Sequence, residues 1–584
     1  MRRSIARFVK LQGMKNALIA DAFDQIADLL EFQGENPFRL RAYRNASRTI
    51  RDLGEPLAAV AAGGVDALKE IPGIGQDLAL KIVTLVTTGD LPMLKELAAK
   101  TPPSVLALLR VPGLGPKKAA VLYKELHVGS LEQLRAACES HLVRDLKGFG
   151  EKTEQKIMEG LTIANSQDER LYWATADEFA QSLIEDLKAC PSVQQIEPAG
   201  SYRRGRETIG DLDILVVADN PTEVMDRLGA FQNVAEVLAR GDTKMSVRLG
   251  GGLQVDLRVV KAESFGAALQ YFTGSKAHNV ELRGRAKSRG LKINEYGVYR
   301  GEESIAGRSE AEVYAALDLP YFPPELREAR KEFDWADAGG LPSLIELADL
   351  QGDLHMHTTA TDGKATLDEM VAAAQARGLK YIAITDHSKR VSMANGLNAE
   401  RLRAQWTEID KLNARLKDFV VLKGVEVDIL EAGGLDLEDD VLSEADWIVA
   451  SVHYGQNQPQ EQITRRILGA ITNPYVSAIA HPTGRLLNRR KPYEVDTDAM
   501  FKAARDHGKL LELNANPARL DLDDVACAAA KSFGVPIVIS SDAHSTKGLA
   551  VLRYGILQAR RAGLTKSDVA NTRSWAEMKR LIGK

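Results

Sequence analysis

Two carboxylates near the middle of the chain have the spacing of a metal site. Asp211 and Asp213 lie in GDLDILVV (210–217), a run rich in β-branched residues that predicts a strand. Residues two apart on a strand point to the same face, so these carboxylates repel each other unless a divalent cation lies between them. Asp256, in the strand-like run LQVDLRVV (253–260), supplies a third carboxylate if the two strands are neighbours. Three such carboxylates can hold two metal ions for nucleotidyl transfer.

The residues just before this strand suit a bound triphosphate. The segment GSYRRG (200–205) opens with Gly200 and Ser201, which can begin a helix, and continues with Arg203 and Arg204. A helix N-terminus with arginines beside it favours phosphate groups. We therefore interpret 200–216 as a metal-dependent nucleotidyl-transfer centre.

A second group of metal-ligand residues lies between residues 350 and 584. Six of the ten histidines in the chain follow apolar, β-branched runs there, and three acids recur with them. The set comprises His355, His357, Asp362, His387, Glu426, His453, His481, Asp542 and His544. A single histidine of this kind is usually a satisfied core residue, but six at successive strand ends favour a metal cluster. Imidazole and carboxylate ligands suit Mn²⁺, Zn²⁺ or Fe²⁺, and such ions can promote phosphodiester hydrolysis.

The elements that position the histidines are predicted from the same runs. Apolar stretches such as YIAIT (381–385), WIVAS (447–451) and PIVIS (536–540) alternate with helical segments. Functional residues gather at the C-terminal ends of the strands in β/α barrels. The pattern therefore predicts a distorted barrel of roughly seven strand–helix units.

Residues 1–165 have apolar residues at helical spacing and a glycine pattern that recurs three times. The copies are IPGIG (71–75), VPGLG (111–115) and KGFG (147–150). Their glycines, which free the backbone to turn and expose its N–H groups to a DNA phosphate, are Gly73, Gly75, Gly113, Gly115, Gly148 and Gly150. One copy could simply join two helices, whereas three copies favour phosphate binding.

Basic residues around the first copy form a candidate site for a 5′-phosphate. Arg39, Arg41, Tyr43 and Arg44 lie close together in FRLRAYRNAS (38–47). Lys81 falls one turn into the helix after IPGIG and could form a Schiff base with a sugar if its pKa is lowered. The alternative is a solvated helix lysine.

Composition limits the remaining possibilities. The 584 residues are too many for one core, and the net charge of −4 excludes bulk attraction to nucleic acid. No apolar run reaches the roughly 20 residues that cross a bilayer. The three cysteines (Cys138, Cys190 and Cys527) lie far apart, which predicts a reducing, cytoplasmic setting.

Further motifs complete a resemblance. YFTGS (271–275) and INEY (293–296) follow GSYRRG, DLD and VDLRV in the order found in family X DNA polymerases, which residues 1–335 resemble. Residues 350–584 resemble the PHP (polymerase and histidinol phosphatase) domain in the motifs HxH, TDH, SVHYG, HPTGR and SDAHS. Together the halves resemble the bacterial PolX polymerases. The resemblance implies a multidomain α/β protein: lyase-like helical domain 1–90, fingers 91–165, nucleotidyltransferase palm 166–265, thumb 266–335, linker 336–349 and a (β/α)₇ PHP barrel 350–584.

The resemblance also assigns roles to residues. It implies that Ser201 and Arg204 contact the triphosphate, that Asn279 touches the base and that Arg283 touches the template. Gly200 belongs to the same nucleotide site, Tyr271, Phe272 and Gly274 would line the sugar pocket, and Arg39 and Tyr43 would contact DNA. Mg²⁺ or Mn²⁺ would be held by Asp211, Asp213 and Asp256. The nine PHP residues named above would hold up to three further ions. Lys81 matches the lyase lysine, but Asp77 replaces a usual DNA-binding lysine, which puts lyase activity in doubt.

The expected function is filling of short DNA gaps in base excision repair, with a separate 3′–5′ exonuclease or 3′-end-processing phosphodiesterase. The expected partners are gapped or nicked DNA and dNTPs, with no membrane, and the chain is expected to be a monomer. Glu512 and Asn514 end another strand and are expected to support the metal ligands or contact substrate. Two alternatives stay open: a PHP phosphatase acting on a small phosphate ester, and a scaffold that binds DNA ends without turnover.

Overall fold

The computed structural model describes residues 16–583, except 52–56, 72, 102–104, 109–110, 112–113, 168–169 and 251. Gly113, one of the predicted phosphate-binding glycines, lies outside the described residues. The chain forms two compact units, residues 1–169 with 488–491, and residues 170–487 with 492–584. Within the described part, no helix has both the length and the apolar character needed to cross a membrane.

The first unit is helical, as its sequence predicts. Its helices are α2 (Asn16–Phe32), α3 (Pro37–Arg51), α4 (Leu57–Ala61), α5 (Gly64–Lys69), α6 (Gln76–Thr88), α7 (Pro92–Lys100), α8 (Val105–Leu108), α9 (Pro116–Leu126), α10 (Leu131–Glu139) and α11 (Glu151–Gln167). Phe23 of α2 packs edge-on against Tyr43 of α3 at 5.7 Å between ring centroids. Gly89 ends α6 with φ +73°, a left-handed conformation that favours glycine.

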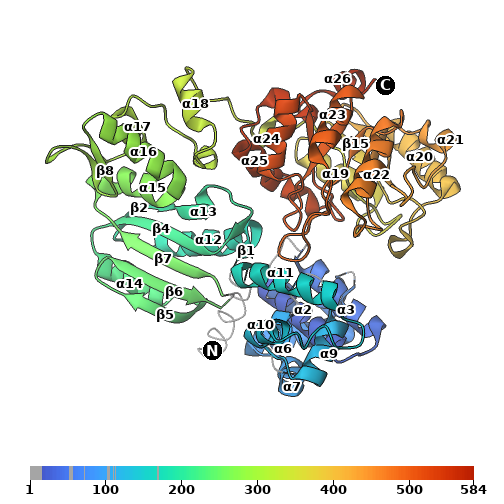
Figure 1. Cartoon of the computed structure of the whole chain (residues 1–584), viewed down its shortest axis with the longest axis horizontal. Helices are drawn as coiled ribbons and strands as arrows, with labels where there is room; N and C mark the ends of the chain where they lie inside the picture. The colour runs from blue at the N-terminus through green and yellow to red at the C-terminus, as the bar shows by residue number, and fades with distance from the viewer. Residues whose placement is uncertain are drawn as a thin grey trace. The chain divides into compact units, whose positions relative to one another are not determined.

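The segment predicted to be the palm forms an α+β subdomain at the start of the second unit. Its elements are β1 (Leu171–Tyr172), α12 (Trp173–Lys188), β2 (Val193–Pro198), α13 (Gly200–Arg203), β3 (Thr208–Ile209), β4 (Asp211–Ala218), α14 (Pro221–Gly229), β5 (Val234–Arg240), β6 (Lys244–Leu249) and β7 (Gln254–Val259). Five strands form one sheet in the order β2-β4-β7-β6-β5, with β4 and β7 parallel (Figure 1).

The segment predicted to be the thumb follows, with helices around a small sheet. Its elements are η1 (Ala262–Ser264), α15 (Phe265–Thr273), α16 (Lys276–Ser288), β8 (Lys292–Asn294), β9 (Gly297–Arg300), β10 (Glu303–Ala306), α17 (Glu310–Ala315), η2 (Pro324–Leu326) and α18 (Glu332–Asp337). The three strands pair antiparallel in the order β10-β9-β8. The short turn η3 (Leu347–Asp349) leads into the last domain.

The C-terminal domain is the predicted barrel. Its strands are β11 (Gly352–Asp353), β12 (Tyr381–Ile384), β13 (Val420–Asp428), β14 (Trp447–Ser451), β15 (Ala478–Ile479), β16 (Leu510–Asn514) and β17 (Ile537–Ser540). Each strand pairs parallel with the next in chain order. Beyond the strand ends, Met356 bridges to Ala543, so the first and last strands meet and the barrel is nearly closed.

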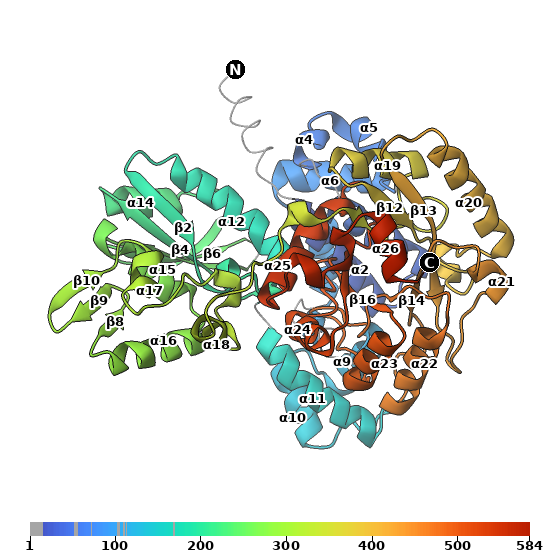
Figure 2. The same cartoon turned by 90° about the horizontal axis from the view of Figure 1, so that it is seen from above.

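Helices cover the outside of this barrel. They are α19 (Leu367–Ala376), α20 (Ala399–Asn413), α21 (Asp439–Leu442), α22 (Gln460–Thr472), α23 (Thr497–Asp506), α24 (Asp524–Phe533), α25 (Leu552–Arg561) and α26 (Trp575–Leu581), with the short turns η4 (Ser392–Ala394), η5 (Gly548–Val551), η6 (Lys566–Asp568) and η7 (Ala570–Thr572). Figure 2 shows α19, α20, α22 and α23 around the strands. Strands β12, β14, β16 and β17 are buried along their whole length, which explains their continuous apolar runs.

Candidate active sites

The palm carboxylates meet through the pairing of two strands. Strands β4 and β7 are neighbours, and their register sets Asp213 opposite Asp256. Asp211 lies on the same face of β4 two residues earlier. Ser246 and Gln254 donate hydrogen bonds to Asp256, the latter from Nε2 to Oδ2 at 2.9 Å. The three predicted metal ligands therefore lie together at one end of the palm sheet.

The charge at this end of the sheet suits a divalent cation. Burial first, and then the neighbouring carboxylates of Asp211 and Asp256, raise the pKa of Asp213 to about 7. The cations Arg258 and Lys244 oppose this shift only in part. Three hard oxygen donors that destabilise one another when ionised are the kind of set that Mg²⁺ or Mn²⁺ binds.

Gly200 lies directly against Asp213. Its φ is +62°, and a Cβ at this position would come within 2.4 Å of Asp213 Oδ2. The backbone N–H of Ala199 donates to the Asp213 carbonyl oxygen at 2.8 Å. A glycine is therefore required where the predicted phosphate-binding turn, with Ser201 next along it, approaches the metal ligands.

The two arginines of GSYRRG have different protein partners. Arg203 makes two hydrogen bonds to Glu310 of the thumb, at 2.8 and 2.7 Å, so it joins palm to thumb. Arg204 donates from Nε to Glu328 Oε1 at 3.0 Å and from Nη1 to the Thr273 carbonyl oxygen at 2.5 Å. Contact of Arg204 with a triphosphate stays a prediction.

The predicted sugar and base contacts lie at the junction of α15 and α16. Tyr271 and Phe272 lie in the last turn of α15 and pack edge-on at 5.1 Å between ring centroids, and Gly274 follows the helix with φ +70°. Asn279 is held inside the protein, because its side chain accepts from Gln270 Nε2 at 2.7 Å and donates to the Tyr271 carbonyl oxygen at 2.8 Å. Arg283, on the same helix, is exposed to solvent.

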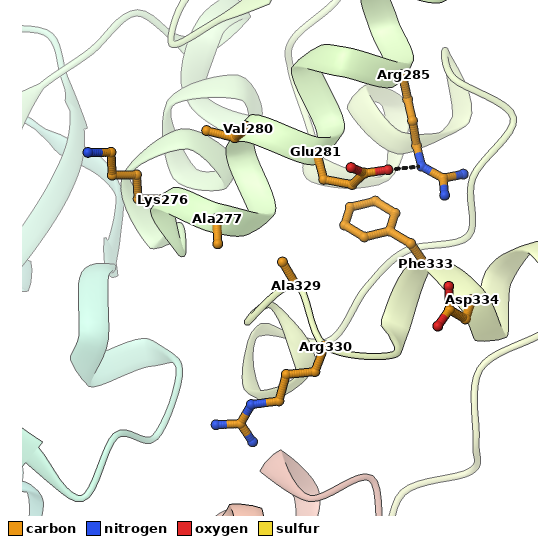
Figure 3. A pocket seen from close by; sticks show the side chains of 9 residues that line it. All are labelled: Lys276, Ala277, Val280, Glu281, Arg285, Ala329, Arg330, Phe333 and Asp334. Carbon is orange, nitrogen blue, oxygen red and sulfur yellow. Dashed lines mark hydrogen bonds and ion pairs between the residues drawn. The ribbon is translucent and has the colours of Figure 1, made fainter.

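An open pocket of about 680 Å³ lies on the thumb beside α16 (Figure 3). Its lining residues are Lys276, Ala277, Val280, Glu281, Arg285, Ala329, Arg330, Phe333 and Asp334. Glu281 pairs with Arg285 at 3.0 Å, and that arginine also lies over the Phe333 ring. None of the predicted metal ligands lines this hollow.

The three glycine motifs share one backbone pattern. In each copy a backbone N–H just after the first glycine donates to a carbonyl three residues earlier, as in Ile74 to Ile71 at 3.0 Å. In each copy the second glycine immediately precedes the first residue of a helix. The equivalent bonds are Leu114 to Val111 at 2.9 Å and Phe149 to Leu146 at 3.0 Å. Gly73, Gly148 and Gly150 have φ of +83°, +87° and +119°. Around Gly75, Gly115, Gly148 and Gly150 the space for a side chain is open, so a phosphate could approach the backbone.

Some of the basic residues predicted to bind a 5′-phosphate form ion pairs with acids of the first unit. Arg44 pairs with Asp28, and with Glu31 at 3.3 Å, so its charge is used within the unit. Arg39 is exposed and lies 3.7 Å from Glu35, while Tyr43 is buried. Lys81 lies over the Tyr43 ring and pairs with Asp77 at 2.5 Å. Lyase chemistry at Lys81 stays a prediction.

The nine predicted PHP ligands converge at the C-terminal ends of the barrel strands. Glu426 lies at the end of β13, and the other eight lie in the loops that follow strands β11, β12, β14, β15 and β17. Three sets have ligand atoms close enough to share an ion: His357, Asp362, His387 and His544; His355, His357 and Asp542; and His387, Glu426 and His453. His481 joins them through Glu426, at 3.0 Å from Nε2 to Oε1.

Two acids bridge the rings. Glu426 Oε2 lies 2.8 Å from His387 Nδ1 and 3.5 Å from His355 Nε2. Asp542 Oδ1 lies 3.2 Å from His357 Nε2. Burial acts to raise the pKa of Glu426, but His453, His387 and His355 hold it well below its usual range.

The donor set fits metal ions. His355 Nε2, both ring nitrogens of His357 and Glu426 Oε2 are buried without a hydrogen-bond partner. Burial and the neighbouring His544 and His387 lower the pKa of His357 to about 4, whereas, despite burial, the acids around His355 and His387 raise the pKa of those two rings. Buried polar atoms that face one another without partners are rare in proteins unless an ion or water satisfies them.

A second layer of acids orients the ligands. Glu512 Oε1 lies 2.7 Å from His355 Nδ1, and Asp428 Oδ1 lies 3.1 Å from His453 Nδ1. Asn514 donates to Glu512 at 3.2 Å and to Asp542 at 3.1 Å. A carboxylate on the far ring nitrogen fixes the tautomer that presents the other nitrogen to a metal. Asp428 was not among the predicted residues, although GVEVD places it two residues beyond Glu426 on the same face of one strand.

Known proteins share both halves of this arrangement. Residues 14–91 match the helix-hairpin-helix domain, 105–162 the SAM-like helix-hairpin-helix tandem, 174–249 the DNA polymerase beta palm, 268–328 the DNA polymerase beta thumb and 353–516 the PHP domain. The "DNA polymerase/3'-5' exonuclease PolX" of Bacillus subtilis is 42% identical over 564 residues, 96% of this chain and 98% of that protein. The chain belongs to the PolX family.

Other relatives cover the PHP half alone. A probable phosphatase of Thermoanaerobacter sp. is 30% identical over 231 residues, 38% of this chain and 89% of that protein. A probable phosphatase of Caldicellulosiruptor saccharolyticus is 33% identical over 207 residues, 33% of this chain and 80% of that protein. PolX membership therefore rests on the match that spans both halves. The exact subdomain boundaries and the roles of individual residues stay predictions.

Proposed function

We propose that this protein fills short gaps in DNA at the palm and removes 3′ ends at the PHP barrel. The observation that carries the first activity is the register that sets Asp213 opposite Asp256, with Gly200 of the phosphate-binding turn against them. The second activity is supported by nine ligand residues around one barrel end. Both activities act on phosphodiester bonds, which suits one substrate, gapped or nicked DNA, in base excision repair.

At the palm, Asp211, Asp213 and Asp256 would hold Mg²⁺ or Mn²⁺. These ions, when bound, supply the charge stabilisation that phosphoryl transfer requires. Ser201 and Arg204 would orient the dNTP triphosphate, the Tyr271–Gly274 turn would line the sugar pocket, and the α16 side chains Asn279 and Arg283 would meet base and template. The helix-hairpin-helix glycines would hold the DNA backbone on either side of the gap.

At the barrel, the nine ligands would hold up to three ions of Mn²⁺, Zn²⁺ or Fe²⁺. Glu512 and Asp428 would keep the ligand rings in the tautomers that metal binding requires. The chain would act as a monomer in the cytoplasm, where its DNA substrate lies. A phosphatase acting on a small phosphate ester is the second candidate, because the probable phosphatases align with this half.

The test uses a 5′-labelled primer in a one-nucleotide gap with Mn²⁺, with and without dNTPs. Asp213→Asn is expected to lose extension by about 10³-fold and to keep degradation of the primer, because only a palm ligand is lost. Glu426→Gln is expected to do the reverse. A wild type that neither extends nor degrades the primer would favour a DNA-end-binding scaffold, and activity on histidinol phosphate alone would favour the phosphatase.

A further inference from the structure

The palm loop formed by residues 204–207 is held by the PHP barrel. This loop joins α13, which begins at Gly200, to β3, which leads into β4 and its carboxylates. Arg561 of α25 donates from Nη1 to the Arg204 carbonyl oxygen at 2.7 Å. Gln558, one turn earlier on the same helix, donates from Nε2 to the Gly205 carbonyl oxygen at 2.9 Å. Two consecutive carbonyl groups of the polymerase loop are thus bound by one barrel helix.

An ion pair holds the same loop farther along. Arg485 Nη2 lies 2.6 Å from Glu207 Oε2, four residues before Asp211. The guanidinium of Arg485 also donates to the carbonyl oxygens of Arg519, at 2.9 Å, and Leu520. Arg485 follows the metal-ligand residue His481 by four positions, so one side chain links the loops of the two active sites.

These contacts are buried and closely packed. Gln558, Arg561 and Arg485 are 2%, 5% and 7% exposed. The hollow between palm and barrel at Glu207 and Gln558 measures only about 10 Å³, which is about the space of one water. Buried side chains that bond to main-chain carbonyls fix the backbone more firmly than exposed ones, because water does not compete for the bonds.

Glu328 extends the network to the predicted triphosphate ligand. Its Oε1 accepts from Arg561 Nη1 at 2.9 Å and from Arg204 Nε at 3.0 Å. Arg561 Nη2 pairs in turn with Asp524 of α24 at 2.8 Å. The barrel therefore holds the backbone of Arg204 directly and its side chain indirectly, through Glu328.

The geometry points to Gln558 and Arg561 as positioning residues for the polymerase reaction, with Arg485 as the link between the two sites. They hold loop 204–207 so that the GSYRRG turn presents its N–H groups and Arg204 to the triphosphate of the incoming nucleotide. The PHP barrel is thus part of the polymerase site, in addition to carrying its own metal centre. This inference rests on the proposed gap-filling function.

A kinetic consequence distinguishes positioning from general support of the fold. A loop that has lost its anchors binds the triphosphate less well, which raises the KM for dNTP. A variant that only reduces the folded fraction lowers the apparent kcat and leaves KM unchanged. The KM for gapped DNA should not change, because the network does not include the helix-hairpin-helix unit.

The experiment measures gap-filling kinetics of the full chain with Gln558→Leu and Arg561→Met. Gln558→Leu is expected to raise the KM for dNTP by about 10-fold, as the loss of one buried hydrogen bond to a loop implies. Arg561→Met is expected to raise it by at least as much, because Glu328 and Asp524 lose a partner as well. Exonuclease rate and bound metal should match the wild type, since neither residue touches a PHP ligand. Equilibrium binding of dNTP with Mg²⁺, followed by calorimetry, gives the same comparison without turnover.

Arg560→Met provides the matched control. Arg560 lies on the same helix and also bonds across to the polymerase half, to Glu325 at 2.7 Å, but it does not contact loop 204–207. Its KM for dNTP should equal that of the wild type. Glu207→Gln tests Arg485 from the palm side and should raise the same KM, with Glu207→Asp restoring part of it.

The outcomes separate the inference from the proposed function. Wild-type gap filling with unchanged KM in Gln558→Leu and Arg561→Met, or an equal rise in Arg560→Met, would overturn the positioning role alone. A wild type that neither fills gaps nor binds dNTP would overturn both. A rise in the KM for dNTP that is confined to the variants contacting loop 204–207 would support the positioning role.

Discussion

The palm and the PHP barrel build their metal-ligand sets in opposite ways. The palm takes three carboxylates from two paired strands, and one register brings them together. The barrel takes nine ligands from successive strand ends and supports their rings with buried acids such as Glu512. The palm ligands come from one pair of strands, so a side chain added next to them should displace them. The barrel ligands come from many strand ends, so their geometry should depend on the hydrogen bonds of the second layer.

The largest expected effect comes from crowding the palm. Gly200→Ala puts a Cβ 2.4 Å from Asp213 Oδ2 on a backbone with φ +62°. Because the clash displaces a metal ligand, we expect gap filling to fall by at least about 10²-fold, while exonuclease activity is kept. Steady-state assays of both activities on one preparation check this. Equal loss of both activities would mean that the chain has unfolded and that the palm site is not local.

Removing a second-layer acid tests the barrel. Glu512→Gln keeps the shape of the side chain but removes the charge 2.7 Å from His355 Nδ1. We expect metal affinity and exonuclease rate to fall by about 10- to 100-fold with gap filling unchanged, because the ring loses the partner that orients it. Metal titration followed by mass spectrometry measures the affinity. Wild-type affinity would show that the ligands hold their geometry without this layer.

Removing a supporting hydrogen bond from the palm should reduce activity less than removing Glu512 does in the barrel. Ser246→Ala removes one hydroxyl donor to Asp256, and Gln254 still donates to the other oxygen. A single bond to a charged group implies about a 10-fold loss of gap filling at most. Rates at several Mg²⁺ concentrations check this, since added metal should restore much of the loss. A loss as large as that of Glu512→Gln on the exonuclease would remove the contrast between the sites.

The smallest expected effect is on stability. Ions that bind the folded barrel and not the unfolded chain raise its free energy of unfolding by about 2.7 kcal/mol at 100 times Kd. Chelation should therefore lower the melting temperature of the barrel transition by several degrees in the wild type and in Asp213→Asn. Glu426→Gln should show a much smaller shift in differential scanning calorimetry. An equal shift in all three proteins would place the stabilising ions outside the barrel.

Much of both sites could be predicted from local sequence. The alternation in DLDILVV and the apolar runs before the histidines determine strands, because side-chain direction and burial repeat with a short period. Glycine motifs at 71–75 and 147–150 likewise determine turns before helices. These features depend on neighbours in sequence, so the chain order of strands, turns and ligands follows directly.

Tertiary structure decided which groups face each other. Arg203 pairs with Glu310, 107 residues later, and Arg44 pairs with Asp28 and Glu31 instead of standing free for a 5′-phosphate. Partners of this kind are selected by packing and desolvation, for which no local pattern exists. Long-range packing also sets the register of Asp213 with Asp256 and the hydrogen bonds from α25 to loop 204–207. The sequence determined the ligands, and the long-range packing determined how two catalytic centres share one framework.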